Sequence, residues 1–460
     1  MVRARDGDAS AGPGVRRHVR GFDGRARRLL VVAALGFLAL TPGTAPGAEL
    51  QTFELPSELV DASTPGGTLE DGRTVPKVHV LLPDGYRADS TRGYPVLWLL
   101  HGANGGTDTW IPGITTLAAG FPGIVVMPDG GQFGMYMDWW NDGVRGGPAW
   151  STYHLQVLRQ EIDRRYPIRP GRRWHAIAGI SMGGQGALRY AAMLPGYFGS
   201  VVGFSAAFPD MQSGVPQVGL DLLPVPNLGG RTVYEAIFGP ADGAFAEGNS
   251  PQALAANYAH LRLYLTSGDG VNCPEDPVTP GIDLDSATEF LINGQQQPFA
   301  DAVRDAGADV TAVTTCGVHT FGVWDRAFAA AREWGFFEPV PEGPRSWVYR
   351  TVATEGEMWG LHFRFAAPPS TVARFERSGS KLSATGNGSV EITGGRGCRL
   401  SAELPFEWRL PPACSRSSGT GRGPSFAHAG LTRLARVGNP RGASRFSPVR
   451  YPGPRLPAAR

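Results

Sequence analysis

Lysine, cysteine and long apolar runs are all scarce in this chain of 460 residues. Lys77 and Lys381 stand among many arginines, and 43 basic residues against 41 acidic ones leave a formal net charge of +2. So small a net charge gives no reason to expect a nucleic-acid partner. A membrane-spanning helix needs about 20 apolar residues, and the sequence contains no convincing candidate for one.

The N-terminal segment combines positive charge with a short apolar run. Several arginines precede the run Leu29 to Leu40, and small residues follow it up to Ala48. This order is typical of a signal peptide, which we place at residues 1–48. An uncleaved membrane anchor is the alternative. We therefore expect a secreted protein, extracellular or associated with the cell envelope.

Four cysteines in an exported chain favour disulfides rather than metal binding. Four cysteines allow three connectivities, and the spacing favours two local pairs, Cys273 with Cys316 and Cys398 with Cys414. The acids clustered from Asp269 to Glu289 lack the spacing of a calcium loop. The sequence therefore predicts no metal and no cofactor.

Apolar runs and amphipathic stretches alternate along residues 49–340. Strand-like runs lie near Val78, Val96, Ile124, Trp174, Val201, Leu261 and Val310. A helical pattern from Thr152 to Tyr166 is typical of the stretches between them. Such alternation predicts one α/β domain with a largely parallel sheet.

The pattern changes after this domain. Residues 341–414 show strict alternation of apolar and polar residues, with Asn387-Gly388 as a hairpin turn, which predicts a small all-β module. The module could bind envelope glycan or cover a cleft, although a structural appendage is the simpler interpretation. Residues 415–460 are rich in Arg, Pro, Gly and Ser and contain no acid, so we expect a disordered tail.

Ser181 is the best candidate nucleophile. It lies in Gly179-Ile180-Ser181-Met182-Gly183, between an apolar run that ends at Ala178 and a helical stretch from Gln185 to Leu194. A nucleophile elbow needs glycines on both sides, because strand and helix approach closely there. The helix that follows points free N–H groups at the site, and the amide of Met182 would stabilise an oxyanion. A glycine-rich turn without chemistry is the alternative.

A second glycine-rich loop, His101 to Gly106, follows the buried-strand run Tyr94 to Leu100. The amide of Ala103 could face the same site as the second oxyanion donor. His101 lies in this loop, and we expect it to contact the substrate rather than to abstract a proton. An ordinary glycine-rich loop is the alternative.

The chain order serine, acid, histidine directs the search for a base downstream of Ser181. His319 is favoured because it lies in a loop after the strand-like run Val310 to Val313, whereas the doubtful His428 belongs to the tail. For the acid, Asp269 ends the run Leu261 to Ser267 and Glu289 opens a helix. Spacing alone leaves these two acids open.

Several ordered motifs together resemble the esterase D superfamily, and most closely its secreted mycolyltransferase branch, the antigen 85 proteins. The motifs are Val80 to Tyr86, Leu99 to Gly102, Met127 to Gln132 with Tyr136, Asp138 and Trp139, Gly179 to Gly183, and Gly317 to Phe321. The resemblance implies an α/β-hydrolase core, oxyanion donors at Met182 and Ala103, and His319 as base. The family's acid is a glutamate ten residues before an F-x-D-A motif. Glu289 has this spacing to Phe299, so the resemblance favours Glu289.

Two departures from this family bear on the substrate. Mycolyltransferases carry an aspartate and an arginine that help hold trehalose where this chain has His101 and Asn104, and a Ser-Trp pair where it has Thr320 and Phe321. Trehalose is therefore in doubt as the acceptor. We expect the substrate to contact His101, Asn104, Trp139 and Phe321.

The sequence thus predicts an exported, monomeric serine esterase or acyltransferase that acts on a small-molecule or lipid acyl ester. Water or a sugar hydroxyl would resolve the acyl-enzyme. One alternative is mycolyltransferase-like transfer to an envelope sugar. Another is a catalytically silent wall-binding protein on a hydrolase scaffold.

Overall fold

The computed structural model describes residues 48–113, 117, 119–143, 147–226, 228–274, 284–395 and 397–415. The predicted signal peptide lies outside the described residues except for Ala48, and the predicted tail lies outside them except for Ser415. His428 and three acids of the cluster, Glu275, Asp276 and Asp283, also lie outside. Within the described part of the chain, none of the helices has the length and apolar character needed to cross a bilayer.

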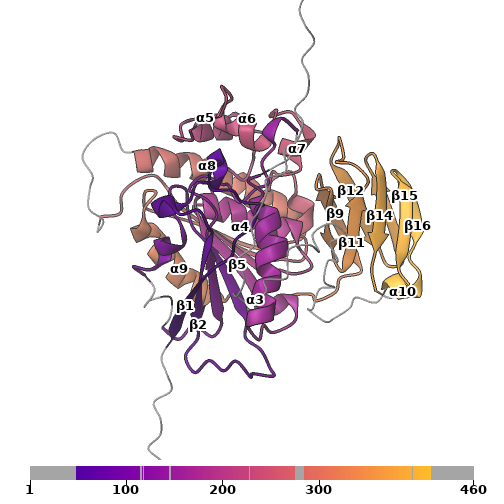
Figure 1. Ribbon diagram of the computed structural model, residues 1–460, viewed down its shortest axis with the longest axis horizontal. Coiled ribbons are helices and arrows are strands. Elements are labelled where there is room, and N and C mark those ends of the chain that lie inside the picture. The colour runs from indigo at the N-terminus through magenta and orange to yellow at the C-terminus, as the bar shows by residue number, and fades with distance from the viewer. Residues whose placement is uncertain are drawn as a thin grey trace, which may run out of the picture. The chain divides into compact units, whose positions relative to one another are not determined.

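An eight-stranded sheet organises the core, in the order β1-β2-β4-β3-β5-β6-β7-β8 (Figure 1). Its strands are β1 Glu49–Glu54, β2 Lys77–Leu82, β3 Val96–Leu100, β4 Ile124–Pro128, β5 His175–Ile180, β6 Ser200–Phe204, β7 Arg262–Gly268 and β8 Asp309–Thr315. The pairings of β1 with β2 and of β2 with β4 are antiparallel, and all others are parallel. The largely parallel α/β-hydrolase sheet is confirmed. The sequence analysis did not predict β1, whose residues are at most partly buried.

Helices follow most strands and cover both faces of the sheet. They are α2 Trp150–Thr152, the π-helix η5 Tyr153–Leu158, α3 Arg159–Arg165, α4 Met182–Met193, α5 Gly214–Asp221, α6 Val233–Phe238, α7 Ala244–Glu247, α8 Leu284–Asp305 and α9 Phe321–Trp334. Short 3₁₀ turns are η1 Pro65–Gly67, η2 Glu70–Gly72, η3 Thr107–Trp110, η4 Asn141–Gly143, η6 Arg172–Trp174 and η7 Ala255–Tyr258. The continuous helical stretch α2-η5-α3 confirms the helix predicted from Thr152 to Tyr166.

Alternate residues of the strands point to opposite faces and build two separate cores. On one face, Val96 and Trp98 pack in the same cluster as residues of α3, α4 and α8. On the other, Leu97 and Leu99 pack in the same cluster as residues of α9. Strands β3 to β6 are buried along their whole length, as expected for parallel strands that are covered on both faces.

The C-terminal strands form two antiparallel sheets of four strands each, β10-β11-β14-β15 and β16-β13-β12-β9. Their bounds are β9 Ser346–Thr351, β10 Glu355–Met358, β11 Leu361–Phe365, β12 Ala373–Ser378, β13 Lys381–Thr385, β14 Ser389–Thr393, β15 Arg399–Glu403 and β16 Phe406–Arg409, followed by α10 Pro412–Ser415. The rings of Phe363, Phe365 and Phe375 pack in one buried cluster. The all-β module is confirmed.

The module contacts the core at the end of α4 that lies away from Ser181. Tyr349 Oη donates to the carbonyl of Met193, the last residue of α4, at 3.0 Å. Arg350 Nη2 forms an ion pair with Glu247 at 2.6 Å. This position does not place the module over the amino-terminal end of α4, where Ser181 lies.

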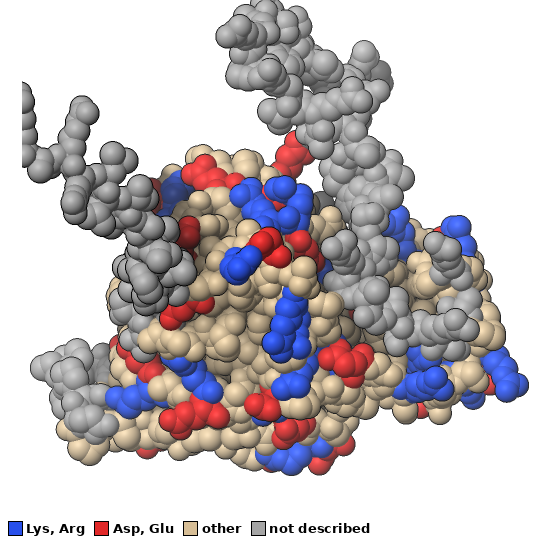
Figure 2. Space-filling view, turned by 90° about the horizontal axis from the view of Figure 1, so that it is seen from below, with Lys and Arg blue, Asp and Glu red and all other residues tan. Residues whose placement is uncertain are grey.

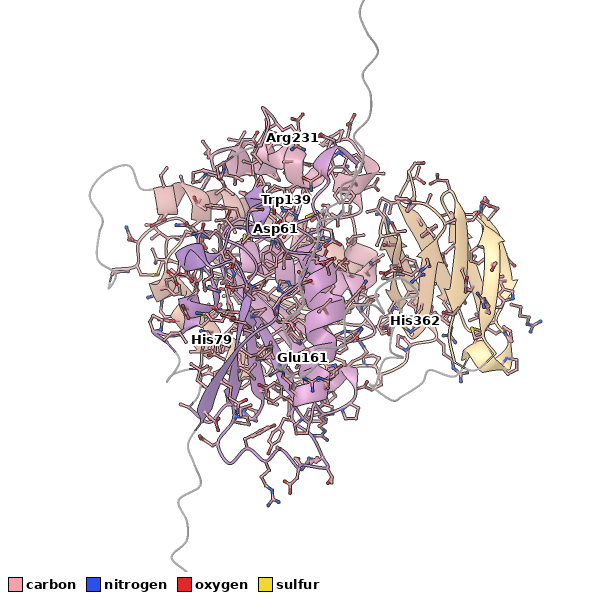
Figure 3. The ribbon with its side chains drawn as sticks, viewed as in Figure 1. Asp61, His79, Trp139, Glu161, Arg231 and His362 are labelled. Carbon is pink, nitrogen blue, oxygen red and sulfur yellow. A yellow bond between two sulfur atoms is a disulfide. The ribbon has the colours of Figure 1, made fainter. Side chains whose placement is uncertain are left out.

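Charged side chains of both signs are interspersed over the face that Figure 2 shows, in keeping with the small net charge. Surface ion pairs include those of Arg164 and Arg165 with Glu161 on α3. Figure 3 labels Glu161. Exposed pairs of this kind contribute only about 0 to 1 kcal/mol each to stability. The fold therefore depends chiefly on its buried apolar clusters.

Both expected disulfides are present, and the one within the module allows a stability test. Cys398 and Cys414 are bonded across a sequence separation of 16. Replacing both by Ala is expected to lower the free energy of unfolding of the module by about 3 kcal/mol, because the unfolded chain regains the entropy of an open loop. Urea denaturation followed by tryptophan fluorescence measures the change. The parent protein reduced with dithiothreitol should show the same module transition, and an unchanged transition in the variant would contradict the prediction.

Candidate active site

Ser181 lies on the turn between β5 and α4 with φ 51° and ψ −118°. A non-glycine residue rarely adopts this backbone conformation. The glycines around it are needed for space: a Cβ at Gly179 would lie 2.2 Å from the carbonyl oxygen of Gly183, and one at Gly183 would lie 2.3 Å from that of Leu100. Strand and helix therefore approach as a nucleophile elbow requires.

Three side chains from distant segments form a continuous row of hydrogen bonds. Ser181 Oγ lies 2.8 Å from His319 Nε2, and His319 Nδ1 lies 2.6 Å from Glu289 Oε2. Ser181 immediately precedes α4, Glu289 belongs to α8, and His319 lies in the loop between β8 and α9. Such a row can withdraw the proton of a serine hydroxyl and stabilise the resulting imidazolium.

The carboxylate of Glu289 is completely buried, and both of its oxygens have partners. Oε2 faces His319, while Oε1 accepts hydrogen bonds from Ser205 Oγ at 2.6 Å and from the amide of Gly268. Ser205 Oγ in turn accepts from Trp324 Nε1 at 3.0 Å. Because a buried charge is tolerated only when it is hydrogen-bonded, these partners hold the acid in place.

The sequence analysis did not identify Ser205 and Trp324 as members of this network. The only available signal for Ser205 was its position just after the strand predicted near Val201, at the carboxyl edge of the sheet. Trp324 had the spacing of a core residue on an amphipathic helix. Its ring does pack edge-on against His319, with centroids 5.0 Å apart.

Asp269, the competing acid, has a different role in the structure. Its Oδ1 accepts hydrogen bonds from the amides of Val271 at 2.8 Å and Gly317 at 3.3 Å. It therefore braces the two loops after β7 and β8. Between the two candidate acids, the geometry favours Glu289.

The Cys273–Cys316 disulfide joins the same two loops, as predicted, across a sequence separation of 43. His319 lies three residues beyond Cys316, and its amide donates to the carbonyl of Asp285 at 3.2 Å. The disulfide and this hydrogen bond restrict the backbone that positions the imidazole.

The two amides predicted as oxyanion donors belong to the first residue of α4 and to the loop after β3. Met182 is the first residue of α4, and Ala103 follows Gly102, where a Cβ would lie 3.5 Å from the Cβ of Ser181. Neither amide donates a hydrogen bond to another of the described residues. Both are thus free to bind a developing negative charge.

Two predicted substrate contacts are wrong. His101 is fully buried: its Nδ1 donates to the carbonyl of Gly102 at 2.8 Å, and its Nε2 accepts from the amide of Gly130 at 2.9 Å. Trp139, labelled in Figure 3, is also buried, and its Nε1 donates to the carbonyl of Gly134 at 3.1 Å. Both side chains use their polar atoms to support loops of the core.

Asn104 and Phe321, the other two predicted contacts, line a cavity of about 670 Å³ that contains Ser181 and His319. Most of the lining is apolar, and it includes Trp110, Pro112, Leu117, Ile180, Phe204, Leu223, Trp324 and Phe328. A cavity of this size and composition is suited to an aliphatic or aromatic group next to the nucleophile.

The polar part of the cavity wall is acidic. Glu70, Asp108 and Asp325 line it, whereas no Lys or Arg does so among the described residues. Burial, together with the nearby charges of Asp71, Asp108 and Asp129, raises the pKa of Glu70. Partial burial opposes ionisation of Asp108, but hydrogen bonds from Lys77 and His79 lower its pKa. Lys77 Nζ lies 2.8 Å from Asp108, so one of the three lining carboxylates is paired with a cation.

No group of three or more His, Cys, Asp or Glu side chains within the described ranges has the arrangement of a metal site.

Comparisons with known proteins find relatives among esterases. A family model described as "Putative esterase" matches residues 73–334. Esterase Rv1288 of Mycobacterium tuberculosis is 37% identical over 257 residues, which are 54% of this chain and 53% of that protein. The diacylglycerol acyltransferase/mycolyltransferase Ag85B of Mycobacterium leprae is 27% identical over 311 residues, 64% of this chain and 86% of that protein.

The chain thus spans about half the length of the esterase relative it matches. Among solved structures, the serine hydrolase FphF of Staphylococcus aureus is 19% identical with a TM-score of 0.46, covering 64% of this chain and 100% of that one.

The hydrogen-bonded row predicts which acid supports the reactivity of Ser181. Glu289→Gln is expected to lower the rate at which Ser181 reacts with a fluorophosphonate probe by on the order of 10⁴, because an amide stabilises neither the required tautomer nor the imidazolium. Asp269→Asn is the matched control and should change the rate little, since Asn retains the accepting oxygen. The reverse ranking would assign the supporting role to Asp269.

Buried histidines predict how the stability of the fold depends on pH. Burial lowers the pKa of His101, of His154 to about 3 and of His175 to about 4. Each folded-state pKa lies below the unfolded value of about 6.5. The unfolded chain therefore binds more protons below that pH, and stability is lost as the pH falls.

We expect the free energy of unfolding to drop between pH 7 and pH 5 by up to about 1.4 kcal/mol per pH unit for each of these histidines. Urea denaturation at several pH values measures the slope. His154→Gln should reduce it, and a stability that is constant or rises as the pH falls would contradict the prediction.

Proposed function

The chain belongs to the Esterase family of α/β-hydrolases, and from this premise we propose that it is an exported serine hydrolase that cleaves carboxylic acyl esters. One observation carries the proposal: Ser181, His319 and Glu289 form an unbroken row of hydrogen bonds beside a largely apolar cavity. The strained elbow and the two unpaired amides support the same assignment.

In the proposed mechanism, Ser181 Oγ attacks the ester carbonyl while His319 Nε2 takes up its proton. Glu289 Oε2 accepts the hydrogen bond from Nδ1 and stabilises the imidazolium. The amides of Met182 and Ala103 bind the oxyanion of the tetrahedral intermediate. When this intermediate collapses, the C–O bond to the alcohol breaks and His319 returns the proton to the leaving oxygen. In the second half of the reaction, His319 takes a proton from water while the water oxygen attacks the acyl carbonyl. The C–O bond to Ser181 Oγ then breaks, His319 returns the proton to Oγ, and the carboxylic acid leaves.

The lining of the cavity supports an assignment of substrate parts. The acyl chain would lie against Ile180, Phe204 and Phe328, where the lining is apolar. The alcohol part would lie near Asn104 and Glu70, where the lining is polar. Because this polar side carries carboxylates without a lining Lys or Arg, the preferred esters would be uncharged.

Transfer to a sugar hydroxyl is the second candidate, and the likeness to a mycolyltransferase favours it. Transfer needs hydrogen bonds that hold the acceptor until it reacts. The burial of His101 removes one side chain that could have supplied them, which leaves Asn104 in this loop. Our proposal is therefore that hydrolysis exceeds transfer to trehalose.

Two disulfides among the described residues support export, since such bonds persist in oxidising compartments. The signal peptide predicted at residues 1–48 would direct it.

Replacement of the nucleophile tests the proposed function. Ser181→Ala is expected to lower kcat on a p-nitrophenyl ester by on the order of 10⁶, because the reaction loses its attacking atom. Thermal unfolding is the control and should be nearly unchanged, since alanine occupies less space and the glycines set the turn. Hydrolysis by the variant at the parent rate would refute the assignment.

The alternatives are separated by two further measurements on the unmodified protein. Absence of fluorophosphonate labelling at Ser181 would favour a catalytically silent binding protein. Mass spectrometry of the products formed with millimolar trehalose distinguishes hydrolysis from transfer, and efficient formation of acyl-trehalose would contradict the preference for water.

A further inference from the structure

Large apolar side chains that remain exposed are concentrated in one region of the described structure. They are Val218, Leu222, Val271, Leu284, Phe290, Leu291 and Phe321, with Leu50 alone outside this region. We call the first seven the apolar rim. Leu222 is 78% exposed, Leu284 71% and Phe290 66%, so the described residues leave most of these side chains uncovered.

The segments that carry the rim are neighbours in space. Gln295 of α8 donates to Ser213, the residue before α5, at 3.0 Å. Val271 pairs with Gly317 in the loop that leads to Phe321. A Cβ at Gly270 would lie 3.0 Å from the Cβ of Phe290. These contacts place the segments that carry the rim next to one another.

This surface adjoins the entrance of the active-site cavity. Leu223, which follows Leu222, lines the cavity, as does Thr288 in the first turns of α8. Phe321 belongs both to the rim and to the cavity lining. The exposed apolar surface and the apolar interior of the cavity are thus continuous.

The pattern of α8 shows that its rim residues do not serve the core. Its buried residues Glu289, Ile292, Gln296, Phe299 and Val303 recur at helical spacing on one face. Leu284, Phe290 and Leu291 lie off that stripe. Contiguous exposed apolar surface is uncommon in soluble proteins and marks a surface that contacts a partner.

Resting on the proposed esterase function, we propose that the apolar rim docks the enzyme on the surface of an uncharged lipid aggregate, from which one acyl chain enters the cavity. Charge indicates the type of lipid. Glu70, Asp108 and Asp325 line the cavity, whereas no Lys or Arg of the described residues does so, and the nearby Lys77 is already paired with Asp108. An anionic headgroup would therefore find no free cationic partner in the described lining. A protein partner bound to the rim would cover Phe321 and block access to the active-site cavity. A lipid aggregate bound there would instead supply substrate to the cavity.

Flotation with neutral vesicles tests the docking. The full chain carrying Ser181→Ala, which cannot consume lipid, is mixed with vesicles of dioleoylphosphatidylcholine that contain dioleoylglycerol. It is expected to float with them. Adding Val218→Asp and Leu222→Asp should weaken the partition coefficient at least about tenfold, because two apolar anchors become charged. Both positions are highly exposed and outside the cavity lining, so the fold should tolerate the changes.

Leu50→Asp is the matched control. Leu50 is also exposed, but it lies on β1 at the edge of the sheet opposite to β8, and its substitution should leave flotation unchanged. The protein with both Val218→Asp and Leu222→Asp is here called the α5 double variant. With Ser181 intact, it should hydrolyse soluble p-nitrophenyl butyrate within twofold of the parent rate, while its rate on emulsified dioleoylglycerol falls in parallel with docking.

Several outcomes would overturn the docking proposal. These are no flotation of the Ser181→Ala protein, equal flotation of the α5 double variant, equal loss in Leu50→Asp, or stronger binding when phosphatidylglycerol replaces the neutral lipid. A concentration-dependent dimer in sedimentation that the α5 substitutions abolish would assign the rim to a second copy of the chain. If the unmodified protein does not hydrolyse p-nitrophenyl butyrate, the proposed esterase function is refuted. Flotation of the Ser181→Ala protein would still test the docking proposal, because it does not depend on hydrolysis.

Discussion

The buried carboxylate of Glu289 is the constraint on which the arrangement of the site depends. Its side chain is fully buried, so each of its oxygens must receive hydrogen bonds from the protein. Ser205 after β6, Gly268 at the end of β7 and His319 after β8 supply them. Three neighbouring parallel strands therefore end around one charge, and the imidazole that it holds is directed at Ser181.

The elbow imposes a second constraint, this time of space. Gly179 and Gly183 bring the backbones of β5 and α4 together, and Gly102 brings the loop after β3 against Ser181. The amides of Met182 and Ala103 have no hydrogen-bond partner among the described residues. The buried carboxylate and the tight turn act together, because one orients the imidazole of His319 while the other fixes the position of Ser181.

The surface around this site is largely apolar. The cavity combines an apolar lining with three carboxylates, and the apolar rim extends the lining to the outside. The β module lies at the far end of α4 and contributes no residue to the cavity lining among the described residues. Helices α8 and α9 and the loop after β3 contribute residues to the lining.

The sequence alone predicted the parallel core, the all-β module, the glycine-flanked turn at Ser181 and the loop that carries His319. These features follow from local patterns: apolar periodicity, glycine spacing and chain order. Spacing left Glu289 and Asp269 open, and only a family resemblance favoured Glu289. The tertiary structure separates them, because both follow β7 and packing decides which carboxylate reaches the imidazole. It also showed that His101 and Trp139 face inward and that Ser205 and Trp324 complete the network. Burial and the direction of a side chain depend on which distant segments pack together, and no local pattern encodes that.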